Sequence, residues 1–216
     1  MNKNEPIQII AAIVVLSAAI LAMINSQSIQ QKMILPVSFS LIIIAVNILA
    51  KKISAYLLDS NIEHEIWKVS QVGLKSTWPW RFKKEVPAGI ILPLLGALAS
   101  IIINTPVLLL AILTYESRAL KTRAAKRFGY YSYTEMTEWH NSIIGASGII
   151  AVFILSAFAY LIGQETLAKI GVYYSFWNLL PISKLDGSQI FFGSKILWSV
   201  LAAISLIFIF LALIIP

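Results

Sequence analysis

The chain has 216 residues, of which 58% are hydrophobic and only 12% are charged, and its mean hydropathy is +0.81. A soluble domain carries about a quarter charged residues, so this composition indicates an integral membrane protein. The absence of cysteine excludes disulfides and thiolate metal sites. The net charge of +7 comes from Lys and Arg between apolar segments, a pattern that favours lipid headgroups as partners and not nucleic acid.

Two apolar segments come first. Residues 7–25 form a predicted span, interpreted as retained and not as a removed signal peptide because no small-residue cleavage site follows it. Residues 34–58 form a second predicted helix, whose pattern continues past two lysines. Each apolar run is about 17 residues or somewhat more, near the lower limit for crossing a membrane.

Residues 62–115 are predicted to form a strand-rich loop with a re-entrant helix. Alternation over residues 63–74 favours a strand, with His64 on a solvated face. The aromatic and basic stretch 78–84 is typical of a membrane interface. The apolar run that follows is too short for two spans and a turn, so we expect a helix at 88–103 that enters and returns, followed by a strand at 107–114.

The C-terminal part contains a predicted span at 142–163, a short helix at 169–187 and a last span at 195–215. Twelve of the 17 Lys and Arg residues lie between positions 51 and 127, which predicts cytoplasmic basic loops, a cytoplasmic N-terminus and a location in the cell membrane. The expected fold is therefore one mostly α, polytopic membrane domain over residues 1–216, with a small cytoplasmic β element.

The most informative stretch is residues 178–187, Asn-Leu-Leu-Pro-Ile-Ser-Lys-Leu-Asp-Gly, which lies between two apolar segments. Its carboxylate, Asp186, lies at or inside the edge of the bilayer, where an uncompensated charge is costly. Asp186 is therefore a candidate functional residue that needs a metal ion, a proton or a cation as its partner.

Asn178 and Pro181, followed by the Asp-Gly pair, resemble the third signature motif of the site-2 protease family of intramembrane zinc metalloproteases. Residues 147–151, Ser-Gly-Ile-Ile-Ala, resemble a degenerate form of the family's Ala-Gly-Pro motif, and the order of elements over about residues 40–195 is similar. The resemblance implies a core of three helices in which Asp186 is a zinc ligand. It also implies that Asn178, Pro181 and Gly187 bind substrate, although Asn178 could equally hold the kink at Pro181 in place.

The family also carries a His-Glu-x-x-His motif, in which two histidines bind zinc and the glutamate activates water. Aligning the residues that follow this motif places it at 47–51, so Asn47, Ile48 and Lys51 would replace both histidines and the glutamate. Asparagine is a poor zinc ligand, an ammonium has no lone pair, and isoleucine cannot accept a proton. The resemblance thus implies an inactive pseudoprotease without a cofactor, which binds membrane lipids and transmembrane segments of other proteins.

Lys51 suggests how Asp186 could be compensated. We expect Asn47, Lys51 and Asp186 to cluster in the core, with the ammonium and the carboxylate within about 8 Å of each other, because a paired charge is tolerated in a low dielectric. The simpler alternatives are that Lys51 extends to the headgroups and that Asp186 caps a helix or is protonated.

Three functions remain open at this point. Beside the pseudoprotease, the chain could be an active zinc metalloprotease with non-standard ligands, in which His140 and Glu138 would join Asp186. It could also be a small transporter or lipid-binding protein that uses Lys51 and Asp186. The basic residues at 118–127 are interpreted as topology determinants.

Overall fold

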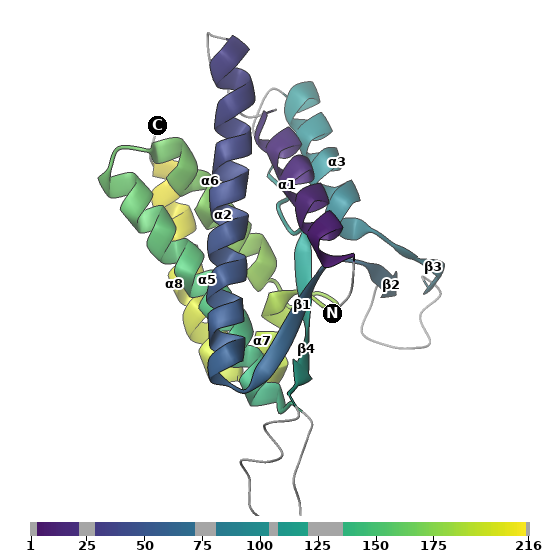
Figure 1. Ribbon diagram of the computed structural model, residues 1–216. Coiled ribbons are helices and arrows are strands. Elements are labelled where there is room, and N and C mark those ends of the chain that lie inside the picture. Colours follow the sequence, from purple (N-terminus) through teal and green to yellow (C-terminus); the bar gives the residue numbers. More distant parts are fainter. Residues whose placement is uncertain (1–3, 22–28, 72–80, 104–107, 121–135, 215–216) are drawn as a thin grey trace, which may run out of the picture.

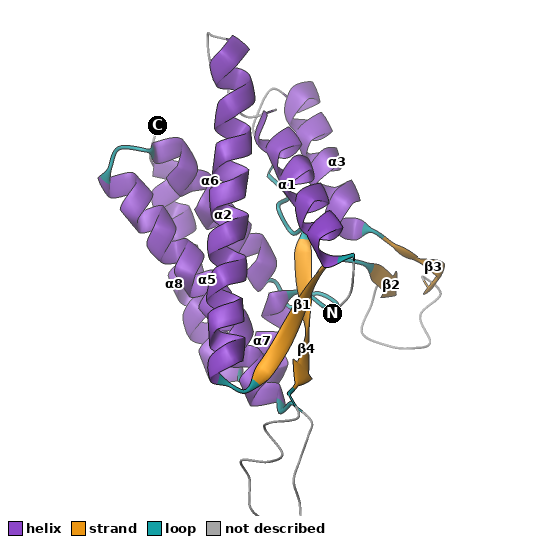
Figure 2. Ribbon diagram, viewed as in Figure 1, coloured by secondary structure: helices purple, strands orange, loops and turns teal. Residues whose placement is uncertain are grey.

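The computed structural model describes residues 4–21, 29–71, 81–103, 108–120 and 136–214. It is mostly helical, with a two-stranded sheet along one side of the helices (Figures 1 and 2). Residues 22–25 of the first predicted span and the basic residues at 121–127 fall outside the described residues. The side chains of the interfacial stretch 78–84 are not described either.

Three helices are long and apolar enough to cross a membrane, namely α2 (Ile29–Leu57) over residues Ile34–Leu57, α5 (Glu138–Leu161) and α8 (Lys195–Ile214) over Lys195–Leu213. Their length and composition indicate a multi-pass membrane protein. Helices α1 (Glu5–Leu21) and α3 (Ala88–Ile103) are apolar but shorter. Large apolar side chains are exposed along α3 and α8, among them Ile102 and Ile196, which is the surface expected of helices that contact membrane lipid.

The main sheet pairs β1 (Ser60–Ile66) with β4 (Leu113–Ala119) in antiparallel register, which sets His64 opposite Tyr115. A second pair joins β2 (Val69–Gln71) to β3 (Arg81–Val86). The predicted strand at 107–114 is wrong in its limits, since the mostly buried residues 108–112 precede β4 without belonging to it, and residue 107 lies outside the described residues. The predicted solvated face of the first strand is also wrong, because His64 is fully buried.

Strand β1 is buried because another element covers its outer edge. A strand edge presents backbone N–H groups that need partners. Here the side chain of Gln8, from α1, accepts a hydrogen bond from the N–H of Ile66 at 2.8 Å, and the carboxylate of Glu5 accepts one from the N–H of His64 at 3.4 Å. Helix α1 therefore covers the edge of β1 that β4 leaves free.

The single helix expected at 169–187 is wrong, because the structure has two helices there. Helix α6 (Glu165–Leu179) ends before Pro181, and α7 (Asp186–Gly193) begins at the candidate carboxylate. Proline disfavours helical backbone in the residue before it, and Leu180 adopts an extended conformation. A Cβ at Gly187 would overlap the carbonyl group of Leu179, so glycine allows α7 to start directly against the end of α6.

Helix α5 lies at the centre of the arrangement, in contact with α2, α6 and α7. It begins at Glu138, earlier than the predicted 142, because Thr137 caps its first turn by accepting a hydrogen bond from the N–H of His140. Buried aliphatic side chains of α1, α2, α5 and α6 form the largest apolar cluster. This packing brings the C-terminal part of α2 to the start of α7.

Candidate functional site

Lys51 and Asp186 form an ion pair inside the protein. The Lys51 Nζ lies 2.5 Å from Asp186 Oδ2, and both side chains are 1% exposed. Lys51 comes from α2 and Asp186 is the first residue of α7, so the pair joins two elements that are far apart in the sequence. The predicted pairing of these two groups is confirmed, and the alternative that Lys51 extends to the headgroups is wrong.

Glycines on α5 make the space for this pair. A Cβ at Gly148 would lie 2.6 Å from Cε of Lys51 and 2.9 Å from Nδ2 of Asn47, so both side chains rest directly on the α5 backbone. One turn earlier, a Cβ at Gly145 would lie 2.9 Å from the hydroxyl oxygen of Tyr115 and 3.6 Å from the backbone oxygen of Asp186. The two glycines share one face of α5, which the polar residues of α2, β4 and α7 approach.

Asn47 lies beside Lys51, as predicted, and it is 1% exposed. Neither its Nδ2 nor its Oδ1 has a hydrogen-bond partner among the described residues, and the same holds for Oδ1 of Asp186. Ile48, which would replace the glutamate if the resemblance holds, packs in the apolar cluster between the helices. The position that would hold a general base is thus part of an apolar core.

Tyr115 is a residue of this site that sequence reasoning missed. The Lys51 ammonium lies 4.9 Å from the centre of its ring, a cation–π contact. Its hydroxyl donates to the backbone oxygen of Asn141 at 2.5 Å, and its own backbone oxygen accepts from Gln189 at 3.0 Å. Burial and the charge of Asp186 raise the pKa of Tyr115 well above its usual value, so the phenol stays neutral.

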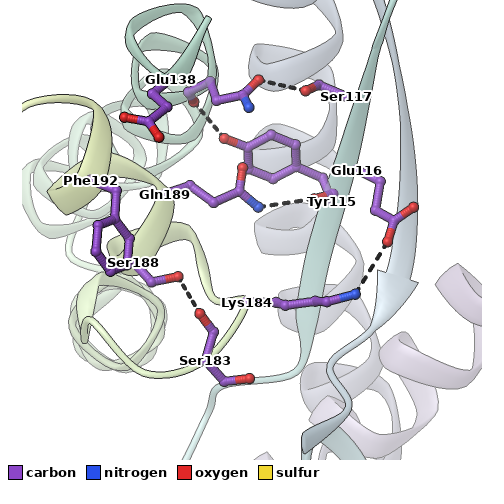
Figure 3. Close-up of a pocket in the computed structure, with 10 residues that line it drawn as sticks. Tyr115, Glu116, Ser117, Glu138, Ser183, Lys184, Ser188, Gln189 and Phe192 are labelled. Carbon is purple, nitrogen blue, oxygen red and sulfur yellow. Dashed lines mark hydrogen bonds and ion pairs between the residues drawn. The ribbon is translucent and has the colours of Figure 1, made fainter. Parts of the chain in front are cut away.

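Tyr115 also lines a polar pocket of about 480 Å³ between the middle of β4, the first turn of α5 and one side of α7 (Figure 3). Tyr115 therefore contacts the buried ion pair and also borders the pocket. At the rim, Lys184 donates to Glu116 at 3.4 Å. Apart from the ring of Phe192, the remaining lining side chains carry hydroxyl, amide or carboxylate groups, from Ser117, Glu138, Asn141, Ser183, Ser188 and Gln189.

The residues predicted to bind substrate fall into different surroundings. Asn178 is buried, and its Nδ2 donates to the backbone oxygen of Tyr174 at 2.8 Å and lies 3.5 Å from that of Leu110. It therefore links α6 to the extended segment that precedes β4. Pro181 is exposed, whereas Gly187 is buried against the end of α6. A role of these residues in binding a substrate stays a prediction.

A second buried cluster surrounds His64. Its Nδ1 lies 3.3 Å from Oε1 of Glu5, and Lys52 Nζ lies 3.0 Å from the same oxygen. Burial and the charge of Lys51 lower the pKa of His64 to about 3, against the opposing effect of Glu5, so the imidazole is neutral at pH 7. Burial raises the pKa of Glu5, but hydrogen bonds from Lys52 and His64 outweigh this effect and the net shift is downward.

The residues at the site do not fit a catalytic zinc ion. Asp186 already faces an ammonium at 2.5 Å, a cation that would repel a metal ion, and Asn47 offers only a weak amide ligand. His140 lies in the first turn of α5, where its Nδ1 contacts the hydroxyl of Thr137. Among the residues that the structure describes, no group of three or more His, Asp or Glu side chains could hold a metal ion.

The arrangement can therefore hold a charge pair at the junction of α2, α5 and α7, next to a polar pocket. It brings together three predicted residues, Asn47, Lys51 and Asp186, and adds Tyr115 to them. No protein-family model, curated protein or solved structure matches this chain.

Proposed function

We propose that the protein is a pseudoprotease of site-2-protease architecture, which binds membrane segments of other proteins without hydrolysing them. The observation that carries this proposal is the ion pair between Lys51 and Asp186. In that architecture Asp186 would be a metal ligand, and here an ammonium compensates its charge instead. The position of the general base is taken by Ile48, whose side chain has no proton acceptor.

Peptide hydrolysis in the membrane needs an activated water molecule and a group that accepts its proton. The Lys51 ammonium has no lone pair while it is charged, and it is held by Asp186 and by the ring of Tyr115. A bound segment would therefore keep its peptide bonds intact. The polar pocket beside Tyr115 has donors and acceptors that suit a segment whose backbone is not fully helical.

Restoring the metal ligands tests the proposed architecture. In the double variant Asn47→His, Lys51→His, two imidazoles one helical turn apart would face Asp186, and we expect about one zinc ion per purified chain. Adding Asp186→Ala to this variant should abolish zinc binding. The matched control is Asn47→His, Lys52→His, which places the second histidine at a residue whose side chain is 45% exposed, and it should bind no zinc.

Measuring the zinc content of the unaltered protein tests whether it is a pseudoprotease. Stoichiometric zinc in the native protein, lost in Asp186→Ala, would show an active-type metal site and refute the pseudoprotease. Failure of the double histidine variant to bind zinc, although it folds, would refute the architecture. Zinc content can be measured by elemental analysis of detergent-purified protein, with helical circular dichroism as the check on folding.

Binding without cleavage needs a separate experiment. A photo-reactive phenylalanine analogue at Phe192, which lines the pocket, should cross-link single-span peptides that carry a non-helical juxtamembrane stretch, and mass spectrometry should find those peptides uncut. The same analogue at Phe210, exposed on α8, is the control for random contact within the micelle. Equal cross-linking at both positions would contradict the assignment of the pocket.

A further inference from the structure

An apolar groove lies between α5, α6 and α8, at the end of the helices away from the ion pair. Its volume is about 370 Å³, more than twice the roughly 150 Å³ of a cavity that holds benzene. The α5–α6 turn and the C-terminal end of α8 lie at the same end of the bundle (Figure 1). The groove therefore lies near one surface of the membrane.

The groove has a floor, two walls and a closed inner end. Helix α6 packs against both α5 and α8 and supplies the floor, with the small side chain of Ala168 and with Val172. The stacked rings of Phe153 and Phe208, with centroids 5.2 Å apart, join α5 to α8. Because Phe208 also lines the groove, this stack closes the end that faces the middle of the bundle.

The polar residues of the groove are gathered near the turn. Tyr160, from the last turn of α5, and Lys169, from the first part of α6, both line it. An aromatic ring and an ammonium at the end of a span are typical of the level of lipid headgroups. An ammonium has three N–H donors, so Lys169 can bind a phosphate oxygen in addition to any contact that it makes within the protein.

We propose that this groove binds one acyl chain of a phospholipid with an anionic headgroup, whose phosphate is held by Lys169. Apolar burial alone cannot select this occupant, because the surrounding lipid tails are as apolar as the groove. Selection must come from the charge of Lys169 and from the shape of a slot that is closed at its inner end. The proposal does not depend on the ion pair or on the pseudoprotease function.

Native mass spectrometry of the full chain tests this proposal. The protein would be reconstituted in equal amounts of dioleoyl phosphatidylglycerol and dioleoyl phosphatidylcholine and then released. We expect one retained phosphatidylglycerol per chain, favoured over phosphatidylcholine by about fivefold, the factor that one lysine near an anionic headgroup supplies. Lys169→Gln should bring the two lipids to near parity, whereas Lys195→Gln, which removes a charge outside the groove, should leave the preference unchanged.

Variants that fill the groove with a larger side chain give a second test of the proposal. Ala157 lines the groove and is exposed, so Ala157→Trp should occupy the slot without disturbing the core and should abolish the retained lipid. Ala203→Trp, at an exposed alanine of α8 outside the groove, should retain it. Equal retention of both lipids by the native chain, or unchanged retention in Ala157→Trp, would overturn the proposal. Inorganic phosphate added at excess should not displace the lipid, and displacement would show a free-anion site instead.

Discussion

Removing one member of the buried ion pair should destabilise the protein strongly, and removing both should not. At 2.5 Å and an effective dielectric constant of about 20, the attraction between Lys51 and Asp186 is about 7 kcal/mol, most of which offsets the cost of taking both charges out of water. Lys51→Met leaves a buried carboxylate without its counter-charge, and Asp186→Leu does the same to the ammonium. Each change should lower the free energy of unfolding by about 3–5 kcal/mol.

The double variant Lys51→Met, Asp186→Leu removes both charges and replaces them with apolar side chains. It should be less destabilised than either single variant, so the coupling energy between the two positions should be at least about 3 kcal/mol. Unfolding in mixed micelles by increasing denaturing detergent, followed by circular dichroism, measures all three. Lys52→Met is the matched control, because Lys52 is 45% exposed and its pairing with Glu5 should contribute less than about 1 kcal/mol.

Additive single effects would refute this reasoning. If the double variant loses the sum of the two single losses, the two side chains do not act on each other and the ammonium does not compensate Asp186. A small loss of unfolding free energy in both single variants would also refute it, since it would show that water reaches the site and screens both charges.

Three further predictions concern the surroundings of the pair. The pKa of His64 is about 3 in the folded chain and about 6.5 when unfolded, so the stability that this residue contributes above pH 6.5 is lost as the pH falls towards 3. Between pH 7.5 and pH 5 the free energy of unfolding should therefore fall by about 2 kcal/mol. The same measurement on His64→Gln should not show this fall. Gly148→Val should cost about 1–3 kcal/mol in the same unfolding assay, because its Cβ would overlap Lys51, and an unchanged stability would contradict the close contact with α5. Gly163→Ala should lower the free energy of unfolding by only about 1 kcal/mol. The backbone φ of +83° disfavours alanine, but no atom lies within 4 Å of the added Cβ. A loss as large as that of Gly148→Val would show that this turn is packed more tightly.

The ion pair could be predicted because it depends on few and simple facts. A carboxylate among apolar residues needs a compensating charge, and Lys51 is the lysine that follows the second apolar run at the spacing expected of a metal-binding motif. The helical class followed in the same way from composition and from the length of the apolar segments. None of these inferences needed the arrangement of the helices.

Tyr115 and Glu5 could not be predicted, because their roles arise from contacts between distant parts of the chain. Tyr115 reaches Lys51 only because β4 pairs with β1 in the register that sets it opposite His64. Alternation within residues 63–74 predicts two faces of a strand but not that α1 covers one edge and buries the histidine. The break between α6 and α7, in contrast, could have been predicted from the sequence, since Pro181 disfavours helical backbone at Leu180.

Stability alone does not account for the pair of Lys51 and Asp186. Replacing a buried ion pair by apolar side chains of similar volume is often neutral or stabilising, so an apolar junction of α2, α5 and α7 would hold at least as well. A charge pair differs from an apolar contact in that it is satisfied in only one arrangement. Together with the close contact at Gly148, it fixes the start of α7 against one turn of α2. The expected small loss in the double variant would then be accompanied by weaker retention of bound segments in the polar pocket, whose walls α7 and Tyr115 supply.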